Sequence, residues 1–181
     1  VVRVILEKRS RNSTAFVFPS VCPECESVAV KQESSGVMGV VWRCPNISCP
    51  AQIRGRLEHW CSRKAMDVEG GGSALIEQLV AKALVEDVAD LYSLSRAQIV
   101  SLERMADKSA ENFLEGVQES KSRDLWRVLF GLGILHVGAG VAKKLARHFE
   151  SIRDRMRSKG DALIALDEVG ESIAERLGTW C

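Results

Sequence analysis

Apolar residues recur at helical spacing through most of the chain after Asp67. In segment 73–85 they follow the i, i+3, i+4 rule of an amphipathic helix, and the same rule holds in 109–117, 141–149 and 172–180. The positions predicted to be buried are Leu75, Ile76, Leu79, Val80, Ala83 and Leu84; Ala110, Phe113, Leu114 and Val117; Val141, Ala142, Leu145 and Phe149; and Ile173, Ala174, Leu177 and Trp180. The pattern therefore predicts that this part of the chain is helical.

The first part of the chain has a different pattern, rich in β-branched residues. Segments 27–31 and 37–43 carry such runs, and Gly36 and Gly39 stand around the turn between them. Two runs of this kind, joined by a short glycine-containing turn, are typical of antiparallel strands. We therefore expect a small β-hairpin ahead of the helices.

A short turn with a small residue stands before each of the four helical segments. The aligned residues are Gly72, Ala106, Gly138 and Gly170, spaced 34, 32 and 32 residues apart, in turns near 70–72, 104–106, 136–138 and 168–170. The sequence therefore predicts four copies of one helix-turn-helix unit. Between the first two turns, Ser95 and Gln98 have the spacing of a capping box.

This repeated unit has the chemistry of a phosphate site. A glycine in the turn permits a positive φ and lets a ligand approach the backbone, and the next helix exposes N–H groups at the positive end of its dipole. Side-chain donors predicted in the first helical turn are Lys108, Ser109, Lys143 and Lys144. The alternative is a plain helical bundle in which glycine only caps a helix. Four copies in register favour the phosphate site.

Composition and charge limit the possible partners. The 181 residues are 46% hydrophobic and 27% charged, enough for one or two domains with a core. No apolar run approaches the roughly twenty residues of a membrane span, so we expect no membrane association. Residues 1–66 carry 10 Lys and Arg against 5 Asp and Glu, residues 67–120 carry 4 against 11, and residues 121–181 carry 11 against 8. A polyanion is therefore expected at the basic ends.

Four cysteines have the spacing of a zinc site. Cys22 and Cys25 form a C-x2-C pair, Cys44 and Cys49 form a C-x4-C pair, and 18 residues separate the pairs. Two such pairs on either side of a hairpin predict a four-sulfur zinc ribbon, whose closed coordination shell stabilises the fold and leaves no position for catalysis. Two disulfides are the alternative, but no signal peptide supports them. Cys61 and Cys181 stand outside the pattern, and we predict no role for them.

The order of these motifs resembles a known family. CPxC and RCPNxxCPAQ are followed by HW, SRKAMDVEG, LIEQLV, VADLYSL, LERMxxKSAENFLEG and LFGLGILHVG. Together they look like the zinc-finger and helix-hairpin-helix region of bacterial NAD-dependent DNA ligases. The resemblance implies a mainly α fold, with residues 1–19 ending a preceding OB-type domain, 20–66 forming the four-cysteine zinc finger and its connecting helix, and 67–181 forming four helix-hairpin-helix motifs. VVRVIL at the start, without Met, reads as the last strand of an excised domain.

The family's activity implies a role for this region. Its members seal nicks in duplex DNA during replication and repair, using NAD and magnesium. The KxDG motif of their adenylation domain is not found in this sequence, so we expect no catalytic residues here. The resemblance implies that this chain holds zinc and clasps nicked duplex DNA without sequence preference, in the bacterial cytoplasm and as a monomer.

Individual residues follow from the same resemblance. Cys22, Cys25, Cys44 and Cys49 match the zinc ligands. The predicted DNA contacts are Gly70, Gly72, Lys108, Ser109, His136, Gly138, Lys143, Lys144 and Gly170. Ala106 and Glu168 depart from the glycine pattern, and Gly71 stands where an apolar residue usually anchors the first hairpin, so we expect that hairpin to be loose and rank the third first.

Two other functions remain open. A non-enzymatic scaffold would use the same ribbon and hairpins to bind DNA, RNA or a repair protein, and the departures at Ala106 and Glu168 fit it. A nuclease would need a magnesium cluster, for which Glu86, Asp87 and Asp90 are close in sequence. Acidic residues near a helix end are more often a solvated surface. For Trp60 and Trp126, we expect packing rather than stacking on bases.

Overall fold

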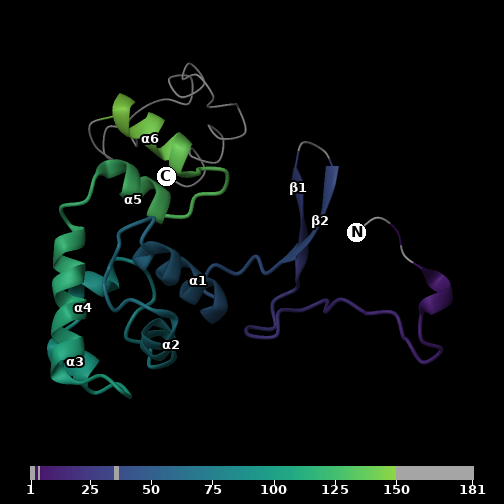
Figure 1. The fold of residues 1–181 in the computed structure, drawn as a ribbon, viewed down its shortest axis with the longest axis horizontal. Coiled ribbons are helices and arrows are strands. Elements are labelled where there is room, and N and C mark those ends of the chain that lie inside the picture. The colour runs from purple at the N-terminus through teal and green to yellow at the C-terminus, as the bar shows by residue number, and fades with distance from the viewer. Residues whose placement is uncertain (1–2, 4, 35–36, 150–181) are drawn as a thin grey trace. The chain divides into compact units, whose positions relative to one another are not determined.

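The computed structural model describes residues 3, 5–34 and 37–149 (Figure 1). The chain divides into two compact units, Val1–Asn46 and Ile47–Cys181. The fourth predicted turn, with Glu168 and Gly170, lies outside the described residues, as does the helix predicted over 172–180.

The first unit contains the predicted hairpin. After a short 3-10 helix, η1 (Leu6–Lys8), strands β1 (Val30–Ser34) and β2 (Val37–Arg43) pair antiparallel. Val30 pairs with Arg43 and Lys31 with Trp42, with an irregularity before Glu33. The first strand begins later than expected because Val28 forms an isolated bridge with Val21, which closes a separate loop. Gly39 lies inside β2 rather than at the turn.

The second unit is helical, as predicted. Its elements are α1 (Pro50–Cys61), α2 (Ser73–Ala81), η2 (Asp90–Ser93), α3 (Arg96–Val100), α4 (Asp107–Ser120), α5 (Leu125–Gly131) and α6 (Ala139–His148). Consecutive helices pack in pairs, α1 on α2, α3 on α4 and α5 on α6, and Figure 1 shows α5 beside α6. No helix among the described residues has both the length and the apolar composition to cross a bilayer.

The predicted apolar stripes form two cores. The first is built by α1 to α4 around the fully buried Phe113, Ile76 and Leu79, and the second by α5 and α6 around Leu145 and Ala142. These side chains come from equivalent positions of successive helix-turn-helix repeats, so the repeat in the sequence is also a repeat in packing. Burying each large apolar side chain contributes about 1.5–3 kcal/mol.

Helix ends follow local chemistry. The capping box is confirmed, since Ser95 Oγ accepts from Gln98 N at 3.3 Å and Gln98 Oε1 accepts from Ser95 N at 2.9 Å. Helix α2 ends at Ala81, earlier than the apolar stripe indicates, because Ala83 adopts a φ of 51°. The N–H of Leu84 then bonds to the carbonyl of Leu79 at 2.9 Å, which closes a Schellman motif.

Candidate metal centre and nucleic-acid interface

The first cysteine pair sits in a tight loop. Cys22 N donates to Ser27 O at 2.8 Å, and Glu26 N donates to Cys22 O at 2.9 Å. Glu26 takes a left-handed φ of 59°, which turns the chain sharply after Cys25. The second pair follows β2: Cys44 comes directly after the strand, and Cys49 is the N-cap residue of α1.

The four sulfur atoms of Cys22, Cys25, Cys44 and Cys49 lie within 4.8 Å of one another, and the Sγ atoms of Cys25 and Cys44 are 3.5 Å apart. Tetrahedral zinc with Zn–S bonds of about 2.3 Å separates its sulfurs by about 3.8 Å, whereas a disulfide bond is about 2.05 Å long. The donor set and its spacing therefore fit zinc. Among the described residues, no other group of three or more His, Cys, Asp or Glu side chains is arranged to hold a metal.

The surroundings of the thiols differ. Hydrogen bonding by the side chain of Ser27, whose Oγ lies 3.3 Å from Cys25 Sγ, lowers the pKa of Cys25 to about 6. Desolvation raises the pKa of Cys44 to about 12. Cys49 is fully buried and is the N-cap residue of α1. A divalent cation stabilises the thiolate form of each ligand, so zinc binding releases protons.

Three of the four predicted turns lie in the described residues, and their backbones are copies of one another. The first position of each turn is left-handed: Gly70, Arg104 and His136 have φ values of 77, 61 and 69°. Two residues later comes the N-cap of the next helix: Gly72, Ala106 and Gly138 have φ values of −82, −79 and −75°. The repeat is therefore conformational as well as compositional.

Hydrogen bonds in the three turns match as well. The N–H groups of Gly71, Met105 and Val137 donate to the carbonyls three residues earlier, at 3.2, 3.3 and 2.9 Å. The first helical bond then runs from Ile76, Ala110 and Ala142 to the N-cap carbonyls, at 3.1, 3.0 and 2.9 Å. Each turn thus leads into a helix whose first N–H groups precede its first α-helical hydrogen bond.

One of the two predicted reasons for glycine at the aligned position, a positive φ, is wrong. The φ values of Gly72 and Gly138 lie in an ordinary extended region, and Ala106 adopts the same conformation. Packing does not require glycine either, because a Cβ built on Gly72 or Gly138 meets no atom within 4 Å. The remaining effect of glycine is the open space it leaves in front of the helix, where a ligand can approach the backbone.

The predicted side-chain donors are placed differently from one another. Lys108 and Ser109 are exposed in the first turn of α4. Lys143 and Lys144 lie in the second turn of α6 instead of its first, because α6 begins at Ala139. The Nζ of Lys143 lies 4.6 Å from the ring centroid of Trp126, which packs partly buried against the second core, as the sequence predicted.

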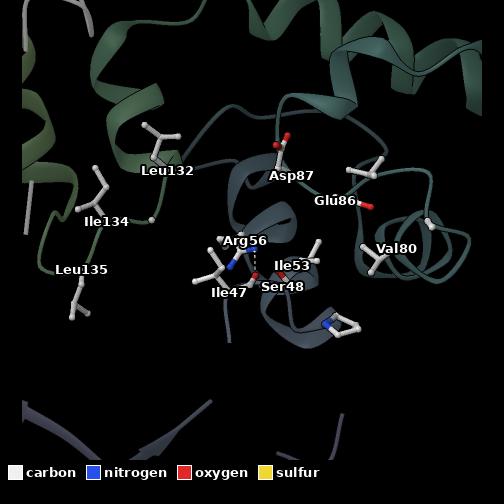
Figure 2. Close-up of a pocket in the computed structure, with 14 residues that line it drawn as sticks. Ile47, Ser48, Ile53, Arg56, Val80, Glu86, Asp87, Leu132, Ile134 and Leu135 are labelled. Carbon is white, nitrogen blue, oxygen red and sulfur yellow. Dashed lines mark hydrogen bonds between the residues drawn. The ribbon is translucent and has the colours of Figure 1, made fainter. Parts of the chain in front are cut away.

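Two of the acidic residues suggested for magnesium accept hydrogen bonds from nearby backbone N–H groups instead. Asp90 Oδ2 accepts from Glu86 N at 2.8 Å, and Asp87 Oδ1 accepts from Ala89 N at 2.7 Å. Glu86 and Asp87 also line a groove of about 970 Å³, together with residues of α1 and residues 132–135, which precede the third turn. Figure 2 shows Arg56 facing this groove, where it donates to the carbonyl of Ile47 at 2.7 Å. The groove is mostly apolar, and the predicted zinc and DNA contacts are not among its lining residues.

Comparison with known proteins agrees with this arrangement. Residues 21–51, which contain all four cysteines of the cluster, match the NAD-dependent DNA ligase C4 zinc finger domain. Residues 127–181, which contain the third turn, match the helix-hairpin-helix motif.

Relatives match almost the whole chain. It is 46% identical to a DNA ligase of Halothermothrix orenii over 178 residues, which is 98% of this chain and 26% of that protein. It is 43% identical to a DNA ligase of Bacillus subtilis and 46% identical to one of Geobacter sulfurreducens, each over 99% of this chain and 26% of the relative. The chain thus spans about a quarter of the length of the relatives it matches. It belongs to the NAD-dependent DNA ligase family and corresponds to its zinc-finger and helix-hairpin-helix region.

Proposed function

We propose that this chain binds the sugar-phosphate backbone of duplex DNA without reading its sequence, as part of an enzyme that seals nicks with NAD and magnesium. The open space in front of Gly72 and Gly138 carries this proposal. Neither the backbone conformation nor the packing of these residues requires glycine. A phosphate at the free N–H groups of α2 and α6 would use the space that a side chain would fill.

The three described turns differ in charge. The first residues of α2 and α6 carry no charge, whereas α4 begins with Asp107, whose side chain is 67% exposed. Asp107 pairs with Arg96 at 2.7 Å, but its carboxylate still lies beside the N–H groups that would receive a phosphate. We therefore assign the main contacts to the first and third turns, with Gly70, His136, Lys143 and Lys144 near them. Lys108 and Ser109 would give a weaker second contact, and Gly170 a fourth outside the described residues.

We further propose that Cys22, Cys25, Cys44 and Cys49 hold the zinc of this region. With four sulfurs the metal has no open position, so bound zinc supplies structure and no chemistry. We retain 20–66 as the zinc finger with its connecting helix, 67–181 as the hairpin domain and 1–19 as the end of a preceding domain. NAD and magnesium act elsewhere in the whole enzyme, which we place in the cytoplasm.

Fluorescence anisotropy tests the DNA proposal. The purified chain is titrated against labelled intact duplex, nicked duplex and single strands of two unrelated sequences, at salt concentrations from about 50 to 200 mM. We expect similar affinity for both duplex sequences and a linear fall of log K with log salt, because phosphate contacts release counterions. Absent binding at low salt, or binding insensitive to salt, contradicts the proposal. The titration with nicked duplex shows whether the nick adds affinity. Analytical ultracentrifugation tests whether the chain is a monomer.

The exposed carboxylate of Asp107 favours a second candidate, a scaffold that binds another protein. A scaffold predicts no duplex binding in the same titration. Asp107→Asn separates the two functions, because removing a negative charge beside a phosphate site strengthens duplex binding, whereas a scaffold gains none.

A further inference from the structure

The first turn lacks the apolar side chain that fixes the other two. Val137, in the middle of the third turn, is 4% exposed and belongs to the second core, and Met105 of the second turn packs against the first core. The equivalent residue of the first turn is Gly71. From the sequence alone, this turn is expected to be loose.

Cys61 occupies the place of the missing side chain. A Cβ built on Gly71 would lie 2.7 Å from the Cβ of Cys61 and 2.9 Å from its Sγ. Cys61 is the last residue of α1 and is only 4% exposed. Its carbonyl also accepts a hydrogen bond from the N–H of Val68, at 3.0 Å, at the start of the turn. The thiol side chain therefore lies directly beneath the turn.

Helix α4 holds the turn from a second direction. A Cβ built on Gly116 would lie 2.8 Å from the backbone nitrogen of Glu69, and one on Gly70 would lie 3.4 Å from the Cβ of Phe113. Gly116 and Phe113 are both buried in α4. Because Glu69 and Gly70 lead directly into Gly71, contacts from α1 and α4 fix the same three residues.

We infer that Cys61 is a positioning residue for the first hairpin: its side chain replaces the missing anchor and sets where the N–H groups of α2 face DNA phosphate. This inference rests on the proposed function. Gly71 is glycine because Cys61 already supplies the β-carbon at this point in the core. The space between positions 61 and 71 therefore has room for a β-carbon on one of the two residues but not on both.

Exchange of that β-carbon tests the pair. Gly71→Ala forces the turn away from Cys61, because the two Cβ atoms cannot approach to 2.7 Å. Duplex affinity is expected to fall about tenfold, the effect of losing one hydrogen-bonded contact to a charged group. The double variant Cys61→Gly/Gly71→Ala moves the β-carbon across the contact and is expected to recover affinity to the level of Cys61→Ala, which lacks the same sulfur.

Gly72→Ala is the matched control, one residue along. Its Cβ meets open space in the protein, so it weakens DNA binding without disturbing the turn, and adding Cys61→Gly does not rescue it. Cys61→Ala removes only the sulfur and therefore folds. It is expected to speed amide hydrogen exchange in 69–73 and to lower affinity several-fold, with an unchanged salt slope because the lost contacts are neutral amides.

All titrations are made well below each variant's melting temperature, with zinc content and circular dichroism verifying the fold. Wild-type affinity in both Gly71→Ala and Cys61→Ala overturns the positioning role, even if their melting temperatures fall. Recovery of melting temperature without recovery of affinity in the double variant also overturns it. A wild-type chain that fails to bind duplex at low salt overturns the proposed function instead, and the positioning role with it.

Discussion

Neither backbone conformation nor packing in the described part of the protein requires glycine at residue 138. Its φ of −75° suits any residue, and an added Cβ would meet no atom within 4 Å. We expect Gly138→Ala to change the free energy of unfolding by less than about 0.5 kcal/mol, as for surface substitutions generally. Duplex affinity should fall several-fold, because the methyl group enters the space of the phosphate.

Gly55→Ala is the control for that variant. Gly55 lies in α1, and a Cβ there also meets open space. Alanine should raise helix stability by up to about 1 kcal/mol and leave DNA affinity unchanged. Equal affinities for Gly138→Ala and wild type, measured by anisotropy beside urea unfolding, would remove the third turn from the interface.

Cys61 should be chemically inert in the folded chain. Burial raises the pKa of its thiol to about 12, so the group stays protonated at every pH below that value. At pH 8 the thiolate fraction is about one part in ten thousand, and only the thiolate reacts with alkylating agents. Mass spectrometry after iodoacetamide treatment should find Cys61 unlabelled in the folded protein and labelled in urea. Rapid labelling of the folded, zinc-loaded chain would show that the first turn opens.

The clustering of the four cysteines was predictable from sequence, whereas the contact between Cys61 and position 71 was not. Cys22 and Cys25 are neighbours in one turn, and their pairing with Cys44 and Cys49 follows from spacings that are themselves local. Cys61 ends α1 and Gly71 lies in the first hairpin turn. Their contact therefore depends on how the chain folds back after the helix. The missing apolar residue at position 71 was visible in the sequence, but the residue that replaces it depends on packing.

At the scale of an element, helix α3 depends on its first residue. It has only five residues, Arg96–Val100, so its end groups are a large part of its hydrogen bonding. Ser95→Ala removes the hydroxyl that accepts from Gln98 N and should lower the free energy of unfolding by about 1 kcal/mol. Urea unfolding measures this, with Ser109→Ala, exposed in the first turn of α4, as the matched control. Equal losses in the two variants would deny the cap a specific role.

The hairpin repeat was visible in sequence, but its conformation was not. An alignment on small residues finds the N-cap positions, whereas the left-handed residues of the second and third turns are Arg104 and His136. A side chain in that conformation costs about 1–2 kcal/mol, so neither residue signals it. The turn's hydrogen bond and the burial of nearby residues, such as Ile134 and Val137, offset this conformational cost.

At the scale of the whole molecule, lysines on different helices test where the proposed phosphate contacts lie. Lys143 of α6 and Lys121 after α4 each lie over an aromatic ring, at 4.6 Å from Trp126 and 5.7 Å from Tyr92. Lys143→Met keeps an apolar stem on the indole but removes the cation. We expect the slope of log K against log salt to fall by about one. Lys121→Met should leave the slope unchanged, and equal slopes for wild type and Lys143→Met would exclude Lys143 from phosphate contact.

The two units should respond differently to loss of metal. In the hairpin of the first unit, Met38 is 61% exposed, Val40 86% and Trp42 39%, so apolar burial stabilises it little. The helical unit instead has two apolar cores of its own. We therefore expect about one zinc ion per chain, and its removal by a chelator should unfold the hairpin while the helices remain, because a small domain without a core depends on its metal.

Atomic absorption, far-ultraviolet circular dichroism and hydrogen exchange in 20–46 measure the three parts of this expectation. Cys44→Ser should reproduce the effect of the chelator and Cys61→Ala should retain zinc. Full zinc content in Cys44→Ser would contradict the four-sulfur site, and loss of all helical signal with the metal would show that the cores are insufficient.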